Sequence, residues 1–351
     1  MIKKKEIEVF AVKPKNETPQ QTKRVYRGVM RRVAAGLLIT LVAFLVTLWV
    51  LPMTETVRDK TREGSADWMS RLPDGQSLGS VVLPGTHDSG TRFVGLAFFS
   101  KCQSLSIGEQ LRAGYRYLDI RLSIDGDSMK LVHGFTNCKV GRKLWDKPLL
   151  LEAVLEECYT FLEEHPTETV VFAVKKENGK DDTAAFEKLV QTYVEKNPSR
   201  WLCTDRIPTV GEARGKLVLM RRYEDAAGLG ADAGISFLWD DQGGNDDTGL
   251  NIAMTDNGTY RLWVQDRFEY ADREKWEAFL GGLHSPDVGQ NDVAVHFLST
   301  KGTAKYGHPF SHARALNPRL LRLQSNELSG WIIVDFADAA LAEKIYSANF
   351  D

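Results

Sequence analysis

The chain has 351 residues, of which 43% are hydrophobic, and its formal net charge at pH 7 is −2. Eight Trp and sixteen Phe within that hydrophobic content exclude an intrinsically disordered chain. The near-neutral charge, without a basic stripe in the folded part, excludes a nucleic-acid partner. The length allows one large domain or two ordinary ones.

The N-terminal segment predicts a single membrane span. Residues 1–32 are polar and carry ten Lys and Arg side chains, whereas residues 33–51 form a run of nineteen residues without a charge. A helix of this length, at ~1.5 Å per residue, nearly matches the ~30 Å hydrocarbon core of a bilayer. Because the basic residues lie on the N-terminal side, we expect the N-terminus in the cytoplasm and the rest outside the cell. A cleaved secretory signal is the alternative, although no A-x-A-like site follows Leu51.

These features divide the chain into four parts. Residues 1–32 are a cytoplasmic basic tail, 33–51 a transmembrane signal anchor in the cell membrane, 52–76 a polar stalk or linker, and 77–351 an extracellular folded domain, which is secreted if the anchor is cleaved. The four cysteines form no C-x-x-C pair, so a zinc site is not expected. A disulfide between Cys102 and Cys138 and buried free thiols both remain open.

From residue 77 onward, short apolar runs alternate with segments of helical period. The runs expected to be strands are 81–83, 117–122, 130–132, 169–174, 216–220, 262–264, 293–298 and 331–334. The helical segments are 149–162, 182–194, 274–283 and 337–347. This alternation predicts βαβ units and a mostly parallel sheet. The dinucleotide-binding and Walker glycine patterns are both absent, which excludes the most familiar nucleotide-binding motifs.

Ionisable residues lie at or near the end of almost every expected strand. They are His87, Asp88, Asp119, Arg121, His133, Lys175, Glu177, Arg222, Asp266 and Asp335. In a (β/α)8 barrel the active site gathers at the carboxyl ends of all strands, whereas an open doubly wound sheet gathers it at one switch point. The pattern therefore predicts an irregular (β/α)8 barrel of the TIM type. For Asp119 and Arg121 alone, an internal ion pair is the simpler explanation.

Two histidines at separate strand ends, with carboxylates and an arginine nearby, suit phosphodiester cleavage. One neutral imidazole can remove a proton from the attacking hydroxyl, and a protonated one can give a proton to the leaving oxygen. A guanidinium can stabilise the charge on the phosphoryl oxygens. The residue pattern leaves open which carboxylate, Asp88 or Asp335, serves which ring. It also allows Asp335 to be simply the cap of the following helix.

Several motifs in order along the chain resemble the bacterial phosphatidylinositol-specific phospholipase C family. They are L-P-G-T-H-D-S-G-T (83–91), Q-L-R-A-G-Y-R-Y-L-D-I-R (110–121), L-V-H-G (131–134), E-T-V-V-F-A-V-K-K-E (168–177), A-R-G-K-L-V-L-M-R-R-Y (213–223), V-Q-D-R-F (264–268) and G-W-I-I-V-D-F (330–336). The resemblance implies that 77–351 is a phosphodiesterase barrel. The implied reaction is attack of the inositol 2-hydroxyl on phosphorus, which releases diacylglycerol and a cyclic inositol phosphate.

The resemblance also implies a role for each site residue. His87 matches the general base and Asp335 its orienting carboxylate, while His133 matches the general acid with Asp88 as its partner. Arg121 matches the phosphate-binding arginine of the metal-independent members, so neither a metal nor another cofactor is expected. The head-group positions are matched by Asp119, Lys175, Glu177, Arg222, Asp266 and Phe268. The family often has Tyr where this chain has Phe268, so one hydroxyl contact to the sugar would be lost.

The expected substrate is phosphatidylinositol or a glycosylated inositol phospholipid in a membrane, and we expect a monomer. Two alternatives remain open. One is a phosphodiesterase that acts on another glycero- or sphingophospholipid, with or without a metal. The other is a catalytically silent surface protein that binds a lipid head group or a glycan. The acidic loop over 240–249 lacks the D-x-D-x-D-G spacing of a calcium loop, so it does not favour calcium.

Overall fold

A computed structural model of the chain describes residues 19–143, 145–177, 179–243, 252–284, 288–289 and 292–351. Eight parallel strands form the barrel that the sequence predicts, in the spatial order β8-β7-β5-β2-β1-β12-β11-β10. In chain order they are β1 (Leu83–Thr86), β2 (Tyr117–Asp125), β5 (Val170–Lys176), β7 (Leu217–Arg222), β8 (Ile235–Ser236), β10 (Arg261–Gln265), β11 (Val293–Phe297) and β12 (Trp331–Val334).

The barrel is irregular because one seam is not closed by a strand ladder. Within the described residues, no backbone ladder joins β8 to β10. Instead, the hydroxyl of Tyr260 donates a hydrogen bond to the carbonyl oxygen of Ser236 across this seam. The predicted irregular (β/α)8 barrel is thus confirmed.

One of the eight predicted strands, 130–132, is confirmed as a strand but does not belong to the barrel. The run 130–132 belongs to β3 (Ser128–His133), which pairs antiparallel with β2 and also with the short β4 (Thr136–Asn137). The eighth barrel strand is β8, which has only two residues and therefore leaves no periodic pattern in the sequence. Two further strands extend the sheet: β6 (Trp201–Leu202) beside β7, and β9 (Ala253–Asp256) antiparallel to β10.

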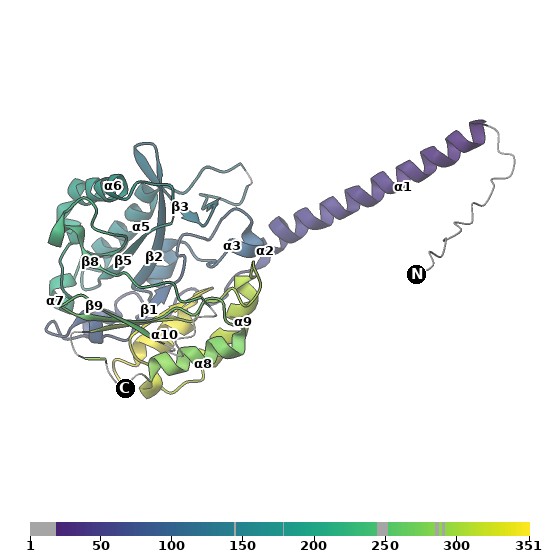
Figure 1. Ribbon diagram of the computed structural model, residues 1–351. Helices are drawn as coiled ribbons and strands as arrows, with labels where there is room; N and C mark the ends of the chain where they lie inside the picture. Colours follow the sequence, from purple (N-terminus) through teal and green to yellow (C-terminus); the bar gives the residue numbers. More distant parts are fainter. Residues whose placement is uncertain (1–18, 144, 178, 244–251, 285–287, 290–291) are drawn as a thin grey trace, which may run out of the picture.

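Helices cover the outside of the barrel (Figure 1). The four predicted helices are confirmed as α5 (Leu151–Glu164), α6 (Thr183–Lys196), α8 (Asp272–Leu283) and α10 (Ala339–Ser347). Asp338 caps α10, because its side chain accepts a hydrogen bond from the amide of Leu341 at 2.9 Å. Asp335 is therefore not the cap of this helix. The sequence pattern misses α9 (Pro309–Leu320) and the short α3 (Ala97–Ser100), α4 (Ile107–Arg112) and α7 (Val210–Ala213).

The alternation of side chains along β2 separates the core from the site. Leu118, Ile120 and Leu122 point outward into a hydrophobic cluster shared with α5 and α6. Tyr117 points inward and packs against Trp331, with ring centroids 5.8 Å apart. Because alternate residues of a strand point to opposite faces, Asp119 and Arg121 share the inner face with Tyr117.

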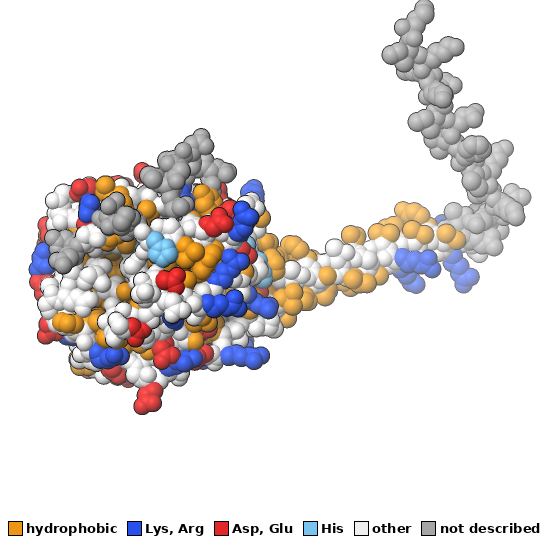
Figure 2. Space-filling view, turned by 90° about the horizontal axis from the view of Figure 1, so that it is seen from below, with side chains coloured by type: hydrophobic (Ala, Val, Ile, Leu, Met, Phe, Trp, Pro, Cys, Tyr) orange, Lys and Arg blue, Asp and Glu red, His pale blue; other side chains and the backbone are white. Residues whose placement is uncertain are grey.

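A long helix projects from the barrel at the N-terminal end (Figure 1). It comprises α1 (Pro19–Leu45), a π-helical turn over Val46–Val50 and α2 (Leu51–Thr54), and its stretch Lys23–Thr54 is long and apolar enough to cross a membrane. Only 6% of the most apolar part of this stretch is buried inside the structure. Figure 2 shows hydrophobic side chains along the helix and Lys and Arg side chains at its far end. The helix is longer than the predicted 33–51.

The segment predicted as a stalk, 52–76, packs against the barrel. Trp68, Met69 and Leu72 lie in the hydrophobic core, with exposed fractions of 2%, 0% and 5%. The indole of Trp68 stacks on the ring of Tyr346 at 5.1 Å and donates a hydrogen bond to the carbonyl oxygen of Gly114. The folded domain therefore begins before residue 77, and the stalk prediction is wrong.

Candidate active site

His87 is held by a tight turn at the carboxyl end of β1. A Cβ atom at Gly85 would lie 2.3 Å from Cδ1 of Ile333, so glycine allows β1 to pack closely against β12. After the strand, Asp88 adopts a left-handed backbone conformation with a φ of 43°. The amide of Gln103 donates to the carbonyl oxygen of His87 at 2.8 Å. This turn directs the imidazole into the barrel mouth.

The two nitrogen atoms of the His87 ring contact different groups. Nδ1 lies 2.8 Å from Oδ1 of Asp335, which directly follows β12. Nε2 lies 2.9 Å from Nη2 of Arg121. Because a guanidinium can only donate and a carboxylate only accept, this arrangement fits the neutral tautomer with its proton on Nδ1. Burial lowers the pKa of His87, but the nearby carboxylates of Asp335 and Asp88 outweigh it, and the net shift is upward.

Arg121 lies at the centre of a group of carboxylates. Its Nε is 3.1 Å from Oδ1 of Asp88, its Nη2 is 3.0 Å from Oδ2 of Asp119, and its Nη1 is 3.4 Å from Oε1 of Glu177. Burial opposes the charge of Arg121, yet these carboxylates raise its pKa well above the usual value. Burial likewise opposes ionisation of Asp119, but the guanidinium groups of Arg121 and Arg222 lower the pKa of its carboxyl group.

His133 faces the same site from the β2–β3 hairpin. Its Nδ1 lies 2.8 Å from the carbonyl oxygen of Ser100, so this nitrogen carries a proton. Its Nε2 lies 3.7 Å from Oδ2 of Asp88, and Nε2 of His87 lies 3.2 Å from the same oxygen. Both histidine rings and Arg121 thus converge on Asp88.

A cavity of about 680 Å³ opens above this cluster. Eight predicted site residues line it: His87, Arg121, His133, Lys175, Arg222, Asp266, Phe268 and Asp335. Asp88, Asp119 and Glu177 are not among its lining residues. Asp119 has an exposed fraction of 0% and lies 3.2 Å from Nη1 of Arg222 through Oδ1, so it holds two arginines rather than contacting a ligand.

Lysine and aromatic side chains complete the lining. Nζ of Lys175 lies 2.7 Å from Oε2 of Glu177, and the pKa of Lys175 is lowered by burial and by the nearby Arg121. The guanidinium of Arg222 lies 3.7 Å from the ring centroid of Trp239, whose indole nitrogen donates to Asp266 at 3.4 Å. Cationic, anionic and aromatic groups therefore surround one cavity, as recognition of a phosphorylated polyol requires.

Sequence reasoning missed two contributors to this site. Trp239 follows the short β8, so placing that strand correctly would have marked it as a strand-end residue. Ser100 contributes only its backbone carbonyl oxygen to His133, and a backbone contact leaves no signal in residue type.

The chain is similar in sequence and in fold to known proteins. A family model described as phosphatidylinositol-specific phospholipase C, X domain, matches residues 86–223. A 1-phosphatidylinositol phosphodiesterase of Staphylococcus aureus is 27% identical over 330 residues, which cover 88% of this chain and 94% of that protein. A solved structure of the S. aureus phosphatidylinositol-specific phospholipase C has a TM-score of 0.65 and 26% identity, covering 81% of this chain and 97% of that chain. Over most of its length the chain is thus similar to bacterial phosphatidylinositol-specific phospholipases C. The phospholipase C of Listeria monocytogenes shares the fold, with a TM-score of 0.60 over 82% of this chain and 99% of that chain at 20% identity.

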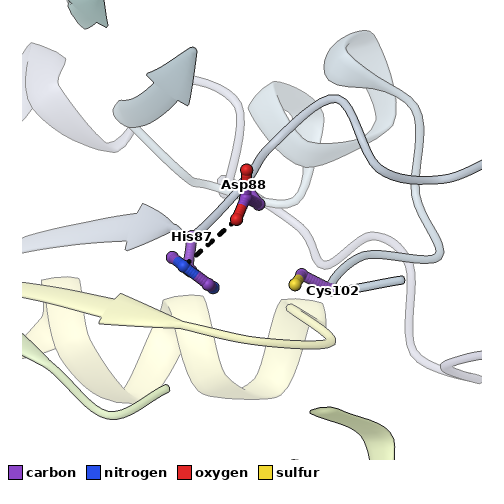
Figure 3. Close-up of side chains that lie close together, drawn as sticks. All are labelled: His87, Asp88 and Cys102. Carbon is purple, nitrogen blue, oxygen red and sulfur yellow. Dashed lines mark ion pairs between the residues drawn. The ribbon is translucent and has the colours of Figure 1, made fainter. Parts of the chain in front are cut away.

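Within the described residues, one group of potential metal ligands lies at the site. His87, Asp88 and Cys102 bring ligand atoms within 4.8 Å of one another (Figure 3). However, the guanidinium of Arg121 already contacts both the Asp88 carboxylate and Nε2 of His87. Burial also raises the pKa of the Cys102 thiol well above its usual value, which disfavours the thiolate that binds metals. This donor set is a poor fit for a metal ion.

The cysteines and the acidic loop add no further site. All four cysteines are free, so the possible bridge between Cys102 and Cys138 is not formed. Of the acidic loop 240–249, residues 244–249 lie outside the described residues. Asp241, which precedes them, lines the cavity.

Proposed function

We propose that the protein cleaves phosphatidylinositol, or a glycosylated inositol phospholipid, without a metal ion. The reaction is attack of the inositol 2-hydroxyl oxygen on phosphorus, while the bond from phosphorus to the glycerol oxygen breaks. The products are diacylglycerol and a cyclic inositol phosphate. The observation that supports this proposal most is the convergence of two imidazoles and one guanidinium on the carboxylate of Asp88.

The two histidines divide the proton transfers. His87 takes the proton of the 2-hydroxyl at Nε2, and Asp335 stabilises the resulting imidazolium through Nδ1 at 2.8 Å. His133 enters the reaction protonated and gives its Nε2 proton to the glycerol oxygen. Its Nδ1 keeps a proton that it donates in a hydrogen bond to the carbonyl oxygen of Ser100, so only the Nε2 proton is free to be delivered. One ring gains a proton and the other loses one, so the step is balanced.

Arg121 stabilises the charge on the phosphoryl oxygens, in place of a cation. Asp88 and Asp119 fix the position of its guanidinium, so little reorganisation is needed when the phosphate binds. Lys175, Arg222 and Asp266 offer directed donors and acceptors for the inositol hydroxyls from the cavity wall. Phe268 and Trp239 supply apolar faces for the sugar ring.

The N-terminal helix anchors the protein in the cell membrane, with the barrel outside and the basic N-terminal segment in the cytoplasm. The charge asymmetry of the span and the exposure of its apolar side chains support this orientation. Protease treatment of intact cells should remove the barrel and leave a fragment that contains the span. Protection of the barrel would reject this topology.

Release of water-soluble product from inositol-labelled phosphatidylinositol tests the activity. We expect the full chain to release a cyclic inositol phosphate, with an equal rate after EDTA treatment. Loss of activity with EDTA would favour the metal-dependent phosphodiesterase, and cleavage of sphingomyelin or phosphatidylcholine instead would favour another substrate class. Binding of inositol phospholipid without any release would favour the silent head-group binder.

A further inference from the structure

The C-terminal end of the membrane helix is hydrogen-bonded directly to the barrel. Nζ of Lys101 donates hydrogen bonds to the carbonyl oxygens of Pro52 and Glu55, at 2.7 and 2.6 Å. Lys101 is itself buried, with an exposed fraction of 6%. A cation that binds the last carbonyl groups of a helix satisfies their hydrogen-bonding capacity and complements the helix dipole. The junction is therefore a built contact and not a flexible tether.

A second set of contacts closes the other side of the junction. Oε1 of the buried Glu55 lies 2.7 Å from Nε2 of His308, next to the start of α9. The ring of His308 stacks on Phe98 of α3, with centroids 4.1 Å apart and planes inclined by 2°. The amide of Val57 donates to Oγ of Ser104 at 3.1 Å. These contacts come from separate parts of the barrel, so they fix the direction in which the helix leaves it.

The short helix α3 belongs to both the junction and the active site. On one side, Ala97 and Lys101 line a small recess together with Trp49 and Pro52 from the end of the membrane helix. On the other side, Phe99 and Ser100 line the catalytic cavity, and the carbonyl oxygen of Ser100 binds His133. Only a single turn of helix therefore separates the membrane anchor from the catalytic cavity.

The surface around this junction has the character of a membrane-facing surface. Basic side chains line the recess, among them the exposed Arg142 and Lys143 and the half-buried Lys139. Nζ of Lys139 lies 5.4 Å from the ring centroid of Trp49, a residue type that favours the membrane–water interface. On the rim of the catalytic cavity, Phe135 and Tyr306 are exposed, with fractions of 80% and 56%. Basic and aromatic groups of this kind suit contact with an anionic lipid surface.

From these contacts we infer that the docked anchor holds the mouth of the catalytic cavity against the bilayer in which the anchor sits. The enzyme therefore takes inositol phospholipid from its own membrane, and not from a facing membrane. Lys101 is a positioning residue in this arrangement. This inference rests on the proposed function, because it specifies where the substrate of that reaction comes from.

Reconstituted full-length protein tests the inference. In one arm, the protein and phosphatidylinositol share the same phosphatidylcholine vesicles; in the other, the protein sits in phosphatidylcholine vesicles and the substrate in separate ones. Rates are expressed per molecule of enzyme whose barrel lies outside the vesicle, and the accessibility of the barrel to protease gives the number of these molecules. Because sharing a surface raises the effective concentration, we expect a rate about 10²-fold or more higher in the first arm. Equal rates in both arms would overturn the inference.

A soluble substrate separates this inference from the proposed function. Short-chain phosphatidylinositol below its micellar concentration needs no membrane, so detergent-solubilised enzyme should cleave it. If it is cleaved but the two vesicle arms do not differ, only the inference fails. If no cyclic inositol phosphate forms even from this substrate, the proposed function fails.

The variant Lys101→Met tests the junction, and Lys60→Met is its matched control. Lys60 lines the same recess, but its side chain is 49% exposed and pairs with Glu109. For each variant, the rate with enzyme and substrate in the same vesicles is divided by its rate with short-chain phosphatidylinositol. A general loss of catalytic activity lowers both rates and does not change this ratio. We expect this ratio to fall about tenfold in K101M, because misorientation at a reacting surface is costly, and to change less than about twofold in K60M. His308→Gln, on the opposite side of the junction, should lower the ratio if K101M does not fold. An unchanged ratio in a folded K101M or H308Q would contradict the positioning role.

Discussion

Two arginines at opposite ends of the part of β2 that pairs with β5 (117–122) show how the same residue type serves two purposes in this barrel. Arg116 directly precedes the strand, and its side chain and that of its partner Glu168 are both 0% exposed. Its guanidinium donates to Glu168 through Nε and Nη2, at 2.9 and 2.7 Å. It also donates to four backbone carbonyl oxygens, those of Ser65, Ala66, Leu111 and Tyr115. Every side of this arginine is therefore enclosed by protein.

Arg121, near the other end of this paired part of β2, is fixed by ion pairs but is not enclosed by protein. Carboxylates of Asp88, Asp119 and Glu177 fix it from below, while it lines the catalytic cavity. The difference follows the general division of labour in such barrels, where the amino-terminal face supports stability and the carboxyl-terminal face carries function. Substitutions at the two ends should therefore affect different measurable quantities.

The largest effect on rate is expected for the two histidines at the catalytic end. His87→Ala and His133→Ala each remove one proton carrier, which lowers kcat by about 10²–10⁴-fold. Release of labelled cyclic inositol phosphate measures this loss, and circular dichroism monitors the fold. Near-normal turnover in either folded variant would reject its assigned role.

Arg121→Met should lower kcat by about 10²–10³-fold, since it removes the donor group for the phosphoryl oxygens. Arg222 and Lys175 still contact Asp119 and Glu177, so the carboxylates beneath the cavity keep cationic partners. The loss of stability should therefore be smaller than for the arginine at the other end. Kinetics and urea unfolding of the same preparation compare the two losses. If R121M is strongly destabilised but its folded fraction has a normal kcat, the expectation is wrong.

Arg116→Met should affect stability instead of chemistry. It leaves Glu168 buried without its cation, and breaking a buried pair in this way costs about 3–5 kcal/mol. The matched control is Arg62→Met, because Arg62 and its partner Glu343 are each 42% exposed. That control should cost far less stability, because an exposed ion pair contributes little. Urea unfolding measures both values, and a large loss of kcat in folded R116M would contradict the separation of the two ends.

The same contrast explains which features could be predicted from sequence. The period of two along β2 predicts that Asp119 and Arg121 share one face, and the ends of apolar runs locate His87 and Asp335. These features depend on local geometry, so they can be predicted from the sequence. The position of Asp88 between both histidine rings depends on a left-handed turn and on packing against other strands, which sequence spacing does not encode.

Features built from distant contacts could not be predicted. The segment 52–76 around Trp68 is largely polar in sequence. Trp68 is buried because it contacts Gly114 and Tyr346, which come from remote parts of the chain. β8 is too short for a periodic pattern, so Trp239 was not assigned to the cavity. Both errors arise because tertiary structure, and not local sequence, determines burial there.

Asp335→Asn should shift the pH dependence of the catalytic end. His87 must be neutral to act as a base, and its pKa is raised, so the acid limb of kcat/KM in the wild type should lie above pH ~6.5. Removing the Asp335 carboxylate removes one cause of this upward shift, and the acid limb should move to lower pH. A pH profile of kcat/KM for both proteins measures the difference. An upward shift or no shift would show that Asp335 does not control His87.

The same substitution should change stability in a pH-dependent way. A group whose pKa is raised on folding contributes stability that is fully present below its unfolded value of ~6.5 and is lost as the pH rises through its folded value. D335N should therefore lose more stability at pH 5 than at pH 9. Urea unfolding at both pH values tests this.

The smallest effect is expected at the cavity wall, for Phe268→Tyr. This change adds one hydroxyl to a ring that lines the cavity. A single neutral hydrogen bond to a sugar hydroxyl contributes about 0.5–1.5 kcal/mol, so KM should fall by about two- to tenfold while kcat stays nearly constant. Short-chain phosphatidylinositol is the appropriate substrate, because membrane binding does not enter its KM. If KM rises instead, the phenyl ring packs too closely against the head group for a hydroxyl, and the cavity of this enzyme is shaped for a ligand that presents an apolar face at Phe268.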